Sequence, residues 1–346
     1  MTHLWVRAES RANEQRVAIT PDGVRALMAA GLDVTVEDSP TRIIPTDAYR
    51  DTGCRIAAQG AWTTAPTDAI ILGLKELPEN GTALPHQHIM FGHAFKGQFS
   101  GQELLRRFAA ADGTLLDLEY LLDDQNRRVA AFGYWAGYAG AAVTALALAA
   151  QNAGQTCAPV TAWPNADTML NDVKTALGTS SATALIIGAK GRVGTGAADL
   201  CNAVGITPTL WDMAETASGG PFPEILDHDL FFNCILARPG TPVFVGPDAL
   251  TAPRRLRAIG DIACDPDSDY NPVPLYSEAS TWADPVLRVQ DTPPLDIMSI
   301  DNLPSLLPLE SSHDFAEQLL PYLLQLGDLE TGVWGRARDI YQSHKL

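Results

Sequence analysis

Basic side chains are scarce in this sequence. Its 346 residues include 24 lysines and arginines against 41 aspartates and glutamates, which gives a net charge of −17. A surface this acidic repels nucleic acid and anionic membranes, so we expect neither as a partner. Any anionic substrate must therefore be bound by individually placed arginines or lysines.

Cysteine is also rare, and the five cysteines form no metal-binding pattern. They contain no C-x-x-C pair and no zinc spacing. The N-terminal stretch MTHLWVRAES lacks the basic segment followed by an apolar one that marks a secretory signal. We therefore predict reduced thiols, no bound metal and a cytoplasmic location, with a structural disulfide left open as the alternative.

Strongly hydrophobic runs are missing. Residues 129–166 carry no charge, but the helical part, AAFGYWAGYAGAAVTALALAAQ, consists mainly of alanine and glycine, which drive membrane insertion weakly. Gly133, Gly137 and Gly140 recur at spacings of four and three, so one face of this helix is nearly flat. We expect a long buried helix that joins two domains and presses against neighbouring backbone.

Short apolar runs alternate with helical patterns along the chain, whose length suits two domains of roughly 150 to 200 residues. Thr20-Pro21 predicts a helix start and Gly31 a helix stop. A late helical segment, 311–326, contains Pro321, which we expect to interrupt it. This order predicts an α/β fold with parallel sheets. The expected strands are 3–9, 33–38, 69–74, 88–94, 113–121, 184–187, 208–212, 230–236, 256–264 and 295–301.

A glycine loop follows the apolar run ALII. Gly188, Gly191 and Gly194 form G-x-x-G-x-x-G between a strand and a helix, which is the context of a dinucleotide-binding fingerprint, although G-x-G-x-x-G is commoner. A purely structural turn is the alternative. Asp212 ends the next strand, where a carboxylate accepts hydrogen bonds from the adenosine ribose hydroxyls. No basic residue occurs at 213–216 to neutralise a 2′-phosphate, so the pattern favours NAD over NADP.

Two residues with proton-transfer chemistry follow expected strands of the first domain. Lys75 follows AIILGL, and His93 closes HIMFGHA. Lys75 is either a solvated strand end or, if partly buried, a general base whose pKa is lowered; Glu76 and Glu119 would raise that pKa again. His93 is either a hydrogen-bonded core residue or an acid–base group.

Three arginines stand among apolar residues instead of in charge runs. For Arg16, Arg127 and Arg128 we expect burial against substrate carboxylates, with ordinary salt bridges as the alternative. His86 and His88 fall in an expected polar loop, and we assign them a structural role.

Together these motifs resemble the NAD-dependent, lysine-forming saccharopine dehydrogenase family, which is related in fold to alanine dehydrogenase. The resemblance implies two Rossmann-like domains with a cleft between them: residues 1–131 with 308–346 as the substrate and catalytic domain, and 132–307 as the NAD-binding domain. It runs nearly end to end through RVAITPDGV, VEDSP, TAPTDAIILGLKELPE, HIMFGHAFKGQ, GTLLDLEYL, RRVAAFGYWAGYAGAA, LIIGAKGRVGTGA, WDMAET, GGPF, NCI and SIDNLPSLLP.

The resemblance also implies a role for individual residues. The lysine of its L-K-E motif and the histidine of its H-x-x-K-x-Q motif, both catalytic, fall on Lys75 and His93. Substrate-binding positions fall on Arg16, Lys96, Gln98, Arg127, Arg128 and Phe132. Cofactor-binding positions fall on Gly191, Arg192, Asp212, Thr216, Ile262 and the IDNL segment, including Asp301 and Leu303, beside Gly188 and Gly194 of the loop.

The implied reaction oxidises the secondary amine of saccharopine to an imine while hydride passes to NAD. Water then releases L-lysine and 2-oxoglutarate. Lys75 would accept the amine proton, and His93 would shuttle protons during hydrolysis. The alternatives are a related amino-acid or opine-type dehydrogenase resembling alanine dehydrogenase and a catalytically silent NAD sensor. We expect small-molecule partners and a monomer or small homo-oligomer.

Three positions depart from the family pattern. Val193 stands in place of a cysteine, so we expect no disulfide between that position and Cys234. Leu236 replaces a tyrosine and Ala263 a serine. The resemblance places both of these near the cleft, where they could alter which substrate is accepted while leaving the hydride chemistry in place.

Overall fold

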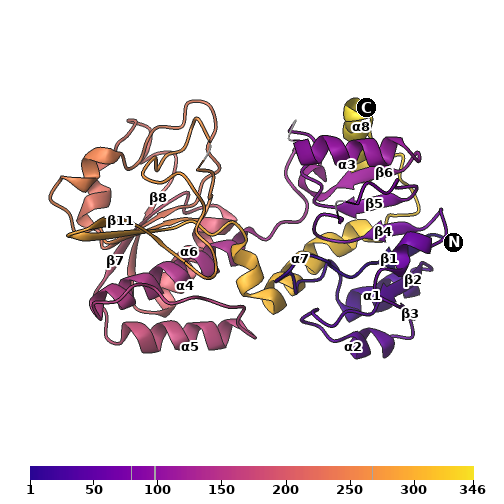
Figure 1. Ribbon diagram of the computed structural model, residues 1–346, viewed down its shortest axis with the longest axis horizontal. Coiled ribbons are helices and arrows are strands. Elements are labelled where there is room, and N and C mark those ends of the chain that lie inside the picture. The colour runs from indigo at the N-terminus through magenta and orange to yellow at the C-terminus, as the bar shows by residue number, and fades with distance from the viewer. Residues whose placement is uncertain (79, 97–98, 267) are drawn as a thin grey trace. The chain divides into compact units, whose positions relative to one another are not determined.

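The computed structural model consists of two compact α/β units, each with its own sheet (Figure 1). Unit 1 comprises Met1–Ala131 and Pro308–Leu346, and unit 2 comprises Phe132–Leu307. Both sheets have six mostly parallel strands, which confirms the expected α/β class with two Rossmann-like domains. The structure describes residues 1–78, 80–96, 99–266 and 268–346.

The sheet of unit 1 is parallel throughout, in the order β3-β2-β1-β4-β5-β6. The order reverses between β1 and β4, so the carboxyl ends of these two strands flank the topological switch point, where α/β sheets place their ligand sites. The strands are β1 His3–Val6, β2 Asp33–Glu37, β3 Arg55–Ala57, β4 Ile70–Leu72, β5 Gln87–Met90 and β6 Thr114–Asp117.

Helices from both ends of the chain cover this sheet. Thr20 accepts the Gly23 N–H at 3.3 Å and begins the first helix, which ends before Gly31 with its φ of +89°, as the sequence predicts. The Tyr341 hydroxyl donates to the Gly113 carbonyl at 3.0 Å, which fastens the last helix beside β6. The helices are α1 Pro21–Ala29, α2 Thr46–Arg50, α3 Phe99–Ala109, α7 Pro308–Leu323 and α8 Gly332–His344, with 3₁₀ turns η1 Ala61–Thr64 and η2 Leu118–Tyr120.

The expectation that Pro321 interrupts its helix is wrong. α7 continues through Pro321 to Leu323. The proline lies in the last turn, where its missing N–H removes a single helical hydrogen bond shortly before the helix ends.

The sheet of unit 2 has the order β11-β12-β10-β9-β7-β8 and is parallel except for β11. This antiparallel edge strand was not expected, because its half-buried sequence LRVQD lacks an apolar run. The strands are β7 Thr183–Ile187, β8 Thr207–Trp211, β9 Leu230–Asn233, β10 Ala258–Asp261, β11 Leu287–Asp291 and β12 Pro294–Met298. The helices are α4 Gly133–Asn152, α5 Ala166–Leu177 and α6 Arg192–Ala203, with 3₁₀ turns η3 Pro223–Asp227, η4 Pro247–Leu250 and η5 Leu303–Leu306.

The glycine face of α4 lies against α6. A Cβ on Gly137 would overlap the Val193 carbonyl oxygen, and one on Gly196 would overlap the Tyr134 carbonyl oxygen. This confirms that the flat face presses against neighbouring backbone. In Figure 1, α5 runs along α4 on the side away from the sheet. Among the residues that the structure describes, no helix has the length and apolar character needed to span a membrane.

Candidate functional site

The glycine loop of unit 2 connects β7 to α6, and its three glycines differ in what requires them. Gly188 has a φ of +86°, and a Cβ there would lie 2.9 Å from the Cys234 carbonyl oxygen. At Gly194 a Cβ would lie 2.5 Å from the Ala189 Cα, so only glycine lets the helix pack against the loop. Gly191 has a negative φ of −77°, and its Cβ would meet only the Gly188 oxygen, at 3.4 Å. Glycine at 191 thus leaves open the space before the N-terminus of α6, where an anion is favoured.

Asp212 follows β8 and lies beside this loop. Its Oδ1 accepts the Met213 N–H at 2.9 Å, and its Oδ2 accepts the Lys190 N–H at 3.1 Å. These two hydrogen bonds hold the pKa of the Asp212 carboxyl below its usual value, so the group is an anion at neutral pH. The Thr216 hydroxyl donates to the Asp212 carbonyl at 3.0 Å and closes the turn.

The other expected cofactor positions also lie in unit 2. Arg192 is exposed at the first residue of α6. Ile262 directly follows β10, and Asp301 and Leu303 follow the neighbouring strand β12. The Ile262 and Leu303 side chains are buried against Gly140, so they belong to the core of unit 2.

Lys75 lies in unit 1, just beyond β4 at the switch point of the sheet. Burial lowers the pKa of its amine, and the nearby Arg16 guanidinium lowers it further, while Glu14 and Glu76 oppose the shift. A lowered pKa increases the neutral fraction of the amine, which is the form that accepts a proton. Burial therefore favours the general-base interpretation of Lys75 over the solvated strand end.

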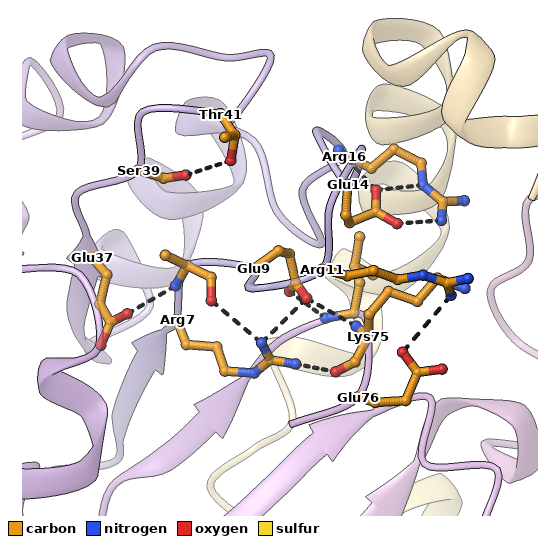
Figure 2. Close-up of polar contacts among 12 residues, drawn as sticks. Arg7, Glu9, Arg11, Glu14, Arg16, Glu37, Ser39, Thr41, Lys75 and Glu76 are labelled. Carbon is orange, nitrogen blue, oxygen red and sulfur yellow. Dashed lines mark hydrogen bonds and ion pairs between the residues drawn. The ribbon is translucent and has the colours of Figure 1, made fainter. Parts of the chain in front are cut away.

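Arg16 is buried, as expected, and its carboxylate partner is Glu14 of the same chain. The Arg16 Nε and Nη2 donate to the two Glu14 carboxylate oxygens at 2.9 and 2.7 Å (Figure 2). The two side chains are 2% and 0% exposed. Burial alone would raise the pKa of Glu14, but the bonds to Arg16 outweigh it and hold that pKa below its usual value. The sequence analysis missed Glu14, because nothing in its spacing shows that it would face Lys75.

His93 lies beyond β5, in a left-handed backbone conformation with a φ of +48°. Its Nδ1 is 3.3 Å from Glu119 Oε2, while Glu119 Oε1 is 3.1 Å from Lys96 Nζ and 3.5 Å from Arg128 Nη2. His93, followed by Lys96 and Arg128, lowers the pKa of Glu119 to about 2. Glu119 thus gathers three of the expected site residues around one carboxylate. Glu119 is not among the largest influences on the pKa of Lys75, and its contacts are with this second group.

Comparison with known proteins identifies the family of this chain. The family model for the N-terminal domain of alanine dehydrogenase/PNT matches residues 5–139. The NAD(+), L-lysine-forming saccharopine dehydrogenase of Yarrowia lipolytica is 44% identical over 99% of this chain and 97% of its own length. The enzyme of the same name from Schizosaccharomyces pombe is 42% identical over 99% and 98%. The chain belongs to the saccharopine dehydrogenase family.

Solved structures that resemble this member of the saccharopine dehydrogenase family show the same fold. An L-alanine dehydrogenase matches with a TM-score of 0.70 at 16% identity, over 99% of this chain and 94% of the other. A transhydrogenase from Sinorhizobium meliloti matches with a TM-score of 0.66 at 19% identity, over 96% and 97%.

The expected burial of Arg127 and Arg128 is wrong. Both are exposed, and the Arg127 side chain, 74% exposed, donates to Asp123 Oδ2 at 2.9 Å. The arginines belong to the polar turn DDQNRR, with Asn126 at a φ of +58°. Only the apolar residues after the turn, beginning at Val129, enter the core.

The location in a polar loop is wrong for His88, which is part of β5. His86 lies in the bend just before that strand, and both rings are buried. The His88 ring packs edge-on against Trp62 and Phe108, and burial keeps its pKa well below the usual value. Neutral aromatic packing of this kind is a structural role.

Two expected substrate-binding residues remain to be placed, and the structure describes only one of them. Phe132 is partly exposed and immediately precedes α4. Gln98 lies outside the residues that the structure describes. The five cysteines are all free thiols, including Cys234.

Asp117 is a titratable group that the sequence analysis did not single out. It ends β6, its side chain is buried, and burial raises its pKa to about 6. Its Oδ1 accepts the Glu119 N–H at 2.8 Å, so it supports the carboxylate that contacts His93. Asp117 ends the apolar run TLLD, and this position at the end of an expected strand could have identified it as a candidate site residue.

Proposed function

We propose that this protein oxidises saccharopine with NAD, releases L-lysine and 2-oxoglutarate, and catalyses the reverse reaction as well. The observation that carries the proposal is the partial burial of Lys75 beside Arg16, which lowers the pKa of an amine placed at the switch point of the unit 1 sheet. The relatives named above share this chain's length from end to end.

The loop of unit 2 fits a dinucleotide. Gly191 is required neither by packing nor by its φ, and its lack of a side chain exposes the backbone at the start of α6 to a pyrophosphate. Asp212 is an anion beside the loop and would accept hydrogen bonds from the ribose hydroxyls. When bound, NAD supplies the hydride acceptor for the reaction. In this proposal unit 2 binds the cofactor, with Arg192, Thr216 and the 301–303 segment contributing.

Lys75 and His93 would divide the proton chemistry. Lys75 Nζ accepts the proton of the substrate's secondary amine as that nitrogen becomes an imine. Water then adds to the imine carbon, and His93 moves protons as the carbinolamine collapses to an amine and a ketone. Glu119 contacts His93 Nδ1 and so sets the orientation of the ring. Lys75 acts as a base and forms no Schiff base, because the imine arises within the substrate.

The substrate carries three carboxylates, which calls for several cationic side chains. We propose that unit 1 is the unit that binds the substrate. Arg128 and Lys96 are the strongest candidates, since both are exposed around Glu119 and able to turn toward a ligand. Arg16 would act from its buried pair with Glu14, and Arg127, Gln98 and Phe132 would complete the set. We further propose a cytoplasmic monomer or small homo-oligomer.

The substrate preference tests this function. Purified protein should oxidise NADH when given 2-oxoglutarate and L-lysine together, and should do so much faster than with pyruvate and ammonia, because only the first pair forms a product with three carboxylates. The decrease in NADH absorbance measures both rates, and NADPH in place of NADH tests the cofactor.

The competing functions give different results in the same assay. Faster turnover of pyruvate with ammonia would overturn the proposal in favour of an alanine dehydrogenase-like enzyme. Tight NADH binding without turnover of either pair would identify a silent sensor. Activity with 2-oxoglutarate and a different primary amine would place the change of substrate at Leu236 and Ala263.

A further inference from the structure

The backbone of Lys75 is held by two side chains from the segment after β1. Glu9 Oε1 accepts the Leu74 N–H at 2.7 Å, and Glu9 Oε2 accepts the Lys75 N–H at 3.0 Å. The Arg7 Nη2 donates to the Lys75 carbonyl oxygen (Figure 2). Lys75 stands beyond the end of β4, so these bonds take the place that ladder hydrogen bonds have within the strand.

The two side chains also bind one another in a dry environment. Arg7 Nη1 is 3.2 Å from Glu9 Oε2, and the side chains are 1% and 8% exposed. The Arg7 N–H donates to the Leu72 carbonyl oxygen at 2.9 Å, so the backbone of Arg7 is in register with β4. The pair therefore links the end of β1 rigidly to the residue that follows β4.

Gly73 makes room for this arrangement. A Cβ at position 73 would lie 2.5 Å from the Arg7 Cζ and would overlap its Nε. The φ of Gly73 is not positive, so its backbone conformation is open to any residue. Glycine is needed at position 73 because the guanidinium lies across the chain there.

We infer that Arg7 and Glu9 are positioning residues that clamp the Lys75 backbone and so aim its side chain for proton transfer. The inference rests on the proposed role of Lys75 as the base. Neither residue needs to contact the substrate, since both act through the peptide groups on either side of the Lys75 Cα.

The clamp places the Lys75 amine among fixed charges. Arg16 and Glu14 form one pair beside it, and Arg11 and Glu76, 3.8 Å apart, form the other. Burial and Arg16 lower the pKa of Lys75 because the amine is kept away from water and near a cation. A loosened backbone would let the amine move toward water, so its pKa would rise toward the ordinary value.

Glu9→Gln tests the clamp with little change of shape, because the new amide group faces one of the two N–H donors. We expect kcat to fall by about 10²-fold while NADH affinity is retained, since a displacement of about 1 Å can cost this much. Glu37→Gln is the matched control. Glu37 is fully buried and accepts the Ala8, Gly60 and Trp62 N–H groups at the end of β2, and no hydrogen bond joins it to Lys75 among the described residues. It should lose stability but keep a near wild-type kcat.

A second measurement reports on Lys75 without any substrate. Competitive acylation of the folded protein across a pH series, read by mass spectrometry of the Lys75 peptide, gives the titration midpoint of the amine. We expect this midpoint to rise in Glu9→Gln and to stay at the wild-type value in Glu37→Gln. Gly73→Ala, which displaces the Arg7 guanidinium and changes no charge, should raise it as well and serves in place of Glu9→Gln if that variant does not fold.

The outcomes separate this inference from the proposed function. Unchanged midpoints in Glu9→Gln and Gly73→Ala, with kcat reduced no more than in Glu37→Gln, would overturn the clamp. If the Lys75 midpoint rises in both variants but the wild-type protein does not turn over saccharopine, the clamp is supported and the proposed function is rejected.

Discussion

Single residues in this protein take their chemistry from partners that are distant in the sequence. Lys75 and His93 both follow strands of the same parallel sheet, yet their surroundings differ. Lys75 is partly buried beside the Arg16–Glu14 pair, and its burial, followed by the Arg16 guanidinium, lowers its pKa, whereas the His93 side chain is 43% exposed and contacts the carboxylate of Glu119. The first environment suits a base that must be neutral, and the second suits a group that exchanges protons with water.

The two groups can be separated by substitution. Lys75→Met and His93→Gln should each lower kcat by roughly 10² to 10⁴, the range typical of lost acid–base catalysis, while NADH binding persists. Steady-state kinetics and NADH fluorescence titration measure the two quantities. Lys174→Met and His313→Gln, which alter exposed residues outside the candidate site, are the matched controls and should keep the wild-type kcat. Normal turnover in both test variants would remove the residues from the mechanism.

At the scale of secondary-structure elements, glycines determine how closely helices and loops approach. The contact between α4 and α6 depends on Gly137 and Gly196, each of which faces a carbonyl oxygen of the other helix. The same effect at Gly194 brings the start of α6 against the loop after β7. The helix that follows the glycine loop is thereby fixed to the core of unit 2.

Gly137→Ala should therefore be costly although alanine is the better helix former. The added methyl group would overlap the Val193 carbonyl oxygen, so we expect the free energy of unfolding to fall by about 3 kcal/mol or more. Gly133→Ala on the same helix is the control: its Cβ would lie 3.3 Å from the Arg192 Cβ, and stability should stay within about 1 kcal/mol of wild type. Urea unfolding followed by circular dichroism compares them, and equal losses would contradict the packing argument.

At the scale of the whole molecule, the two units differ in how the chain builds them. Unit 2 is one continuous segment, while unit 1 needs residues from both ends of the chain. Val17 donates its N–H to Ser312 Oγ at 2.9 Å, and Tyr341 is fully buried in the unit 1 core. The N-terminal part alone would leave the surfaces covered by α7 and α8 open to water.

This difference predicts unequal behaviour of fragments. Residues 132–307 should fold alone and bind NADH with a Kd within about tenfold of the full chain, whereas residues 1–131 should not fold.

Asp212→Ala in the 132–307 fragment should lower the affinity for NADH and reduce the preference for NADH over NADPH. The substitution removes both the acceptor for the ribose hydroxyls and the negative charge that repels a 2′-phosphate. Circular dichroism and fluorescence titration measure both. An unfolded 132–307 fragment, or unchanged affinity in its Asp212→Ala form, would contradict these expectations.

Much of the fold follows from local patterns. The expected strands overlap ten of the twelve strands found among the described residues, because an apolar run bounded by turn residues indicates burial directly. The glycine loop and the start of α1 were also predictable, since proline has a fixed φ and glycine lacks a Cβ, so the residue type itself indicates the local conformation. The three-residue strand β3 and the half-exposed strand β11 were not predicted, because neither contains an apolar run.

The sequence by itself determined the α/β class, the glycine loop, and the positions of Lys75, His93 and Asp212 near strand ends, because each depends on residues close together in the chain. Only the tertiary structure decided what these residues touch. Glu9 accepts the Lys75 N–H from 66 positions away, and Glu119 contacts His93 from 26 positions away. Such partners are chosen by the order of strands in the sheet, and local periodicity contains no information about that order.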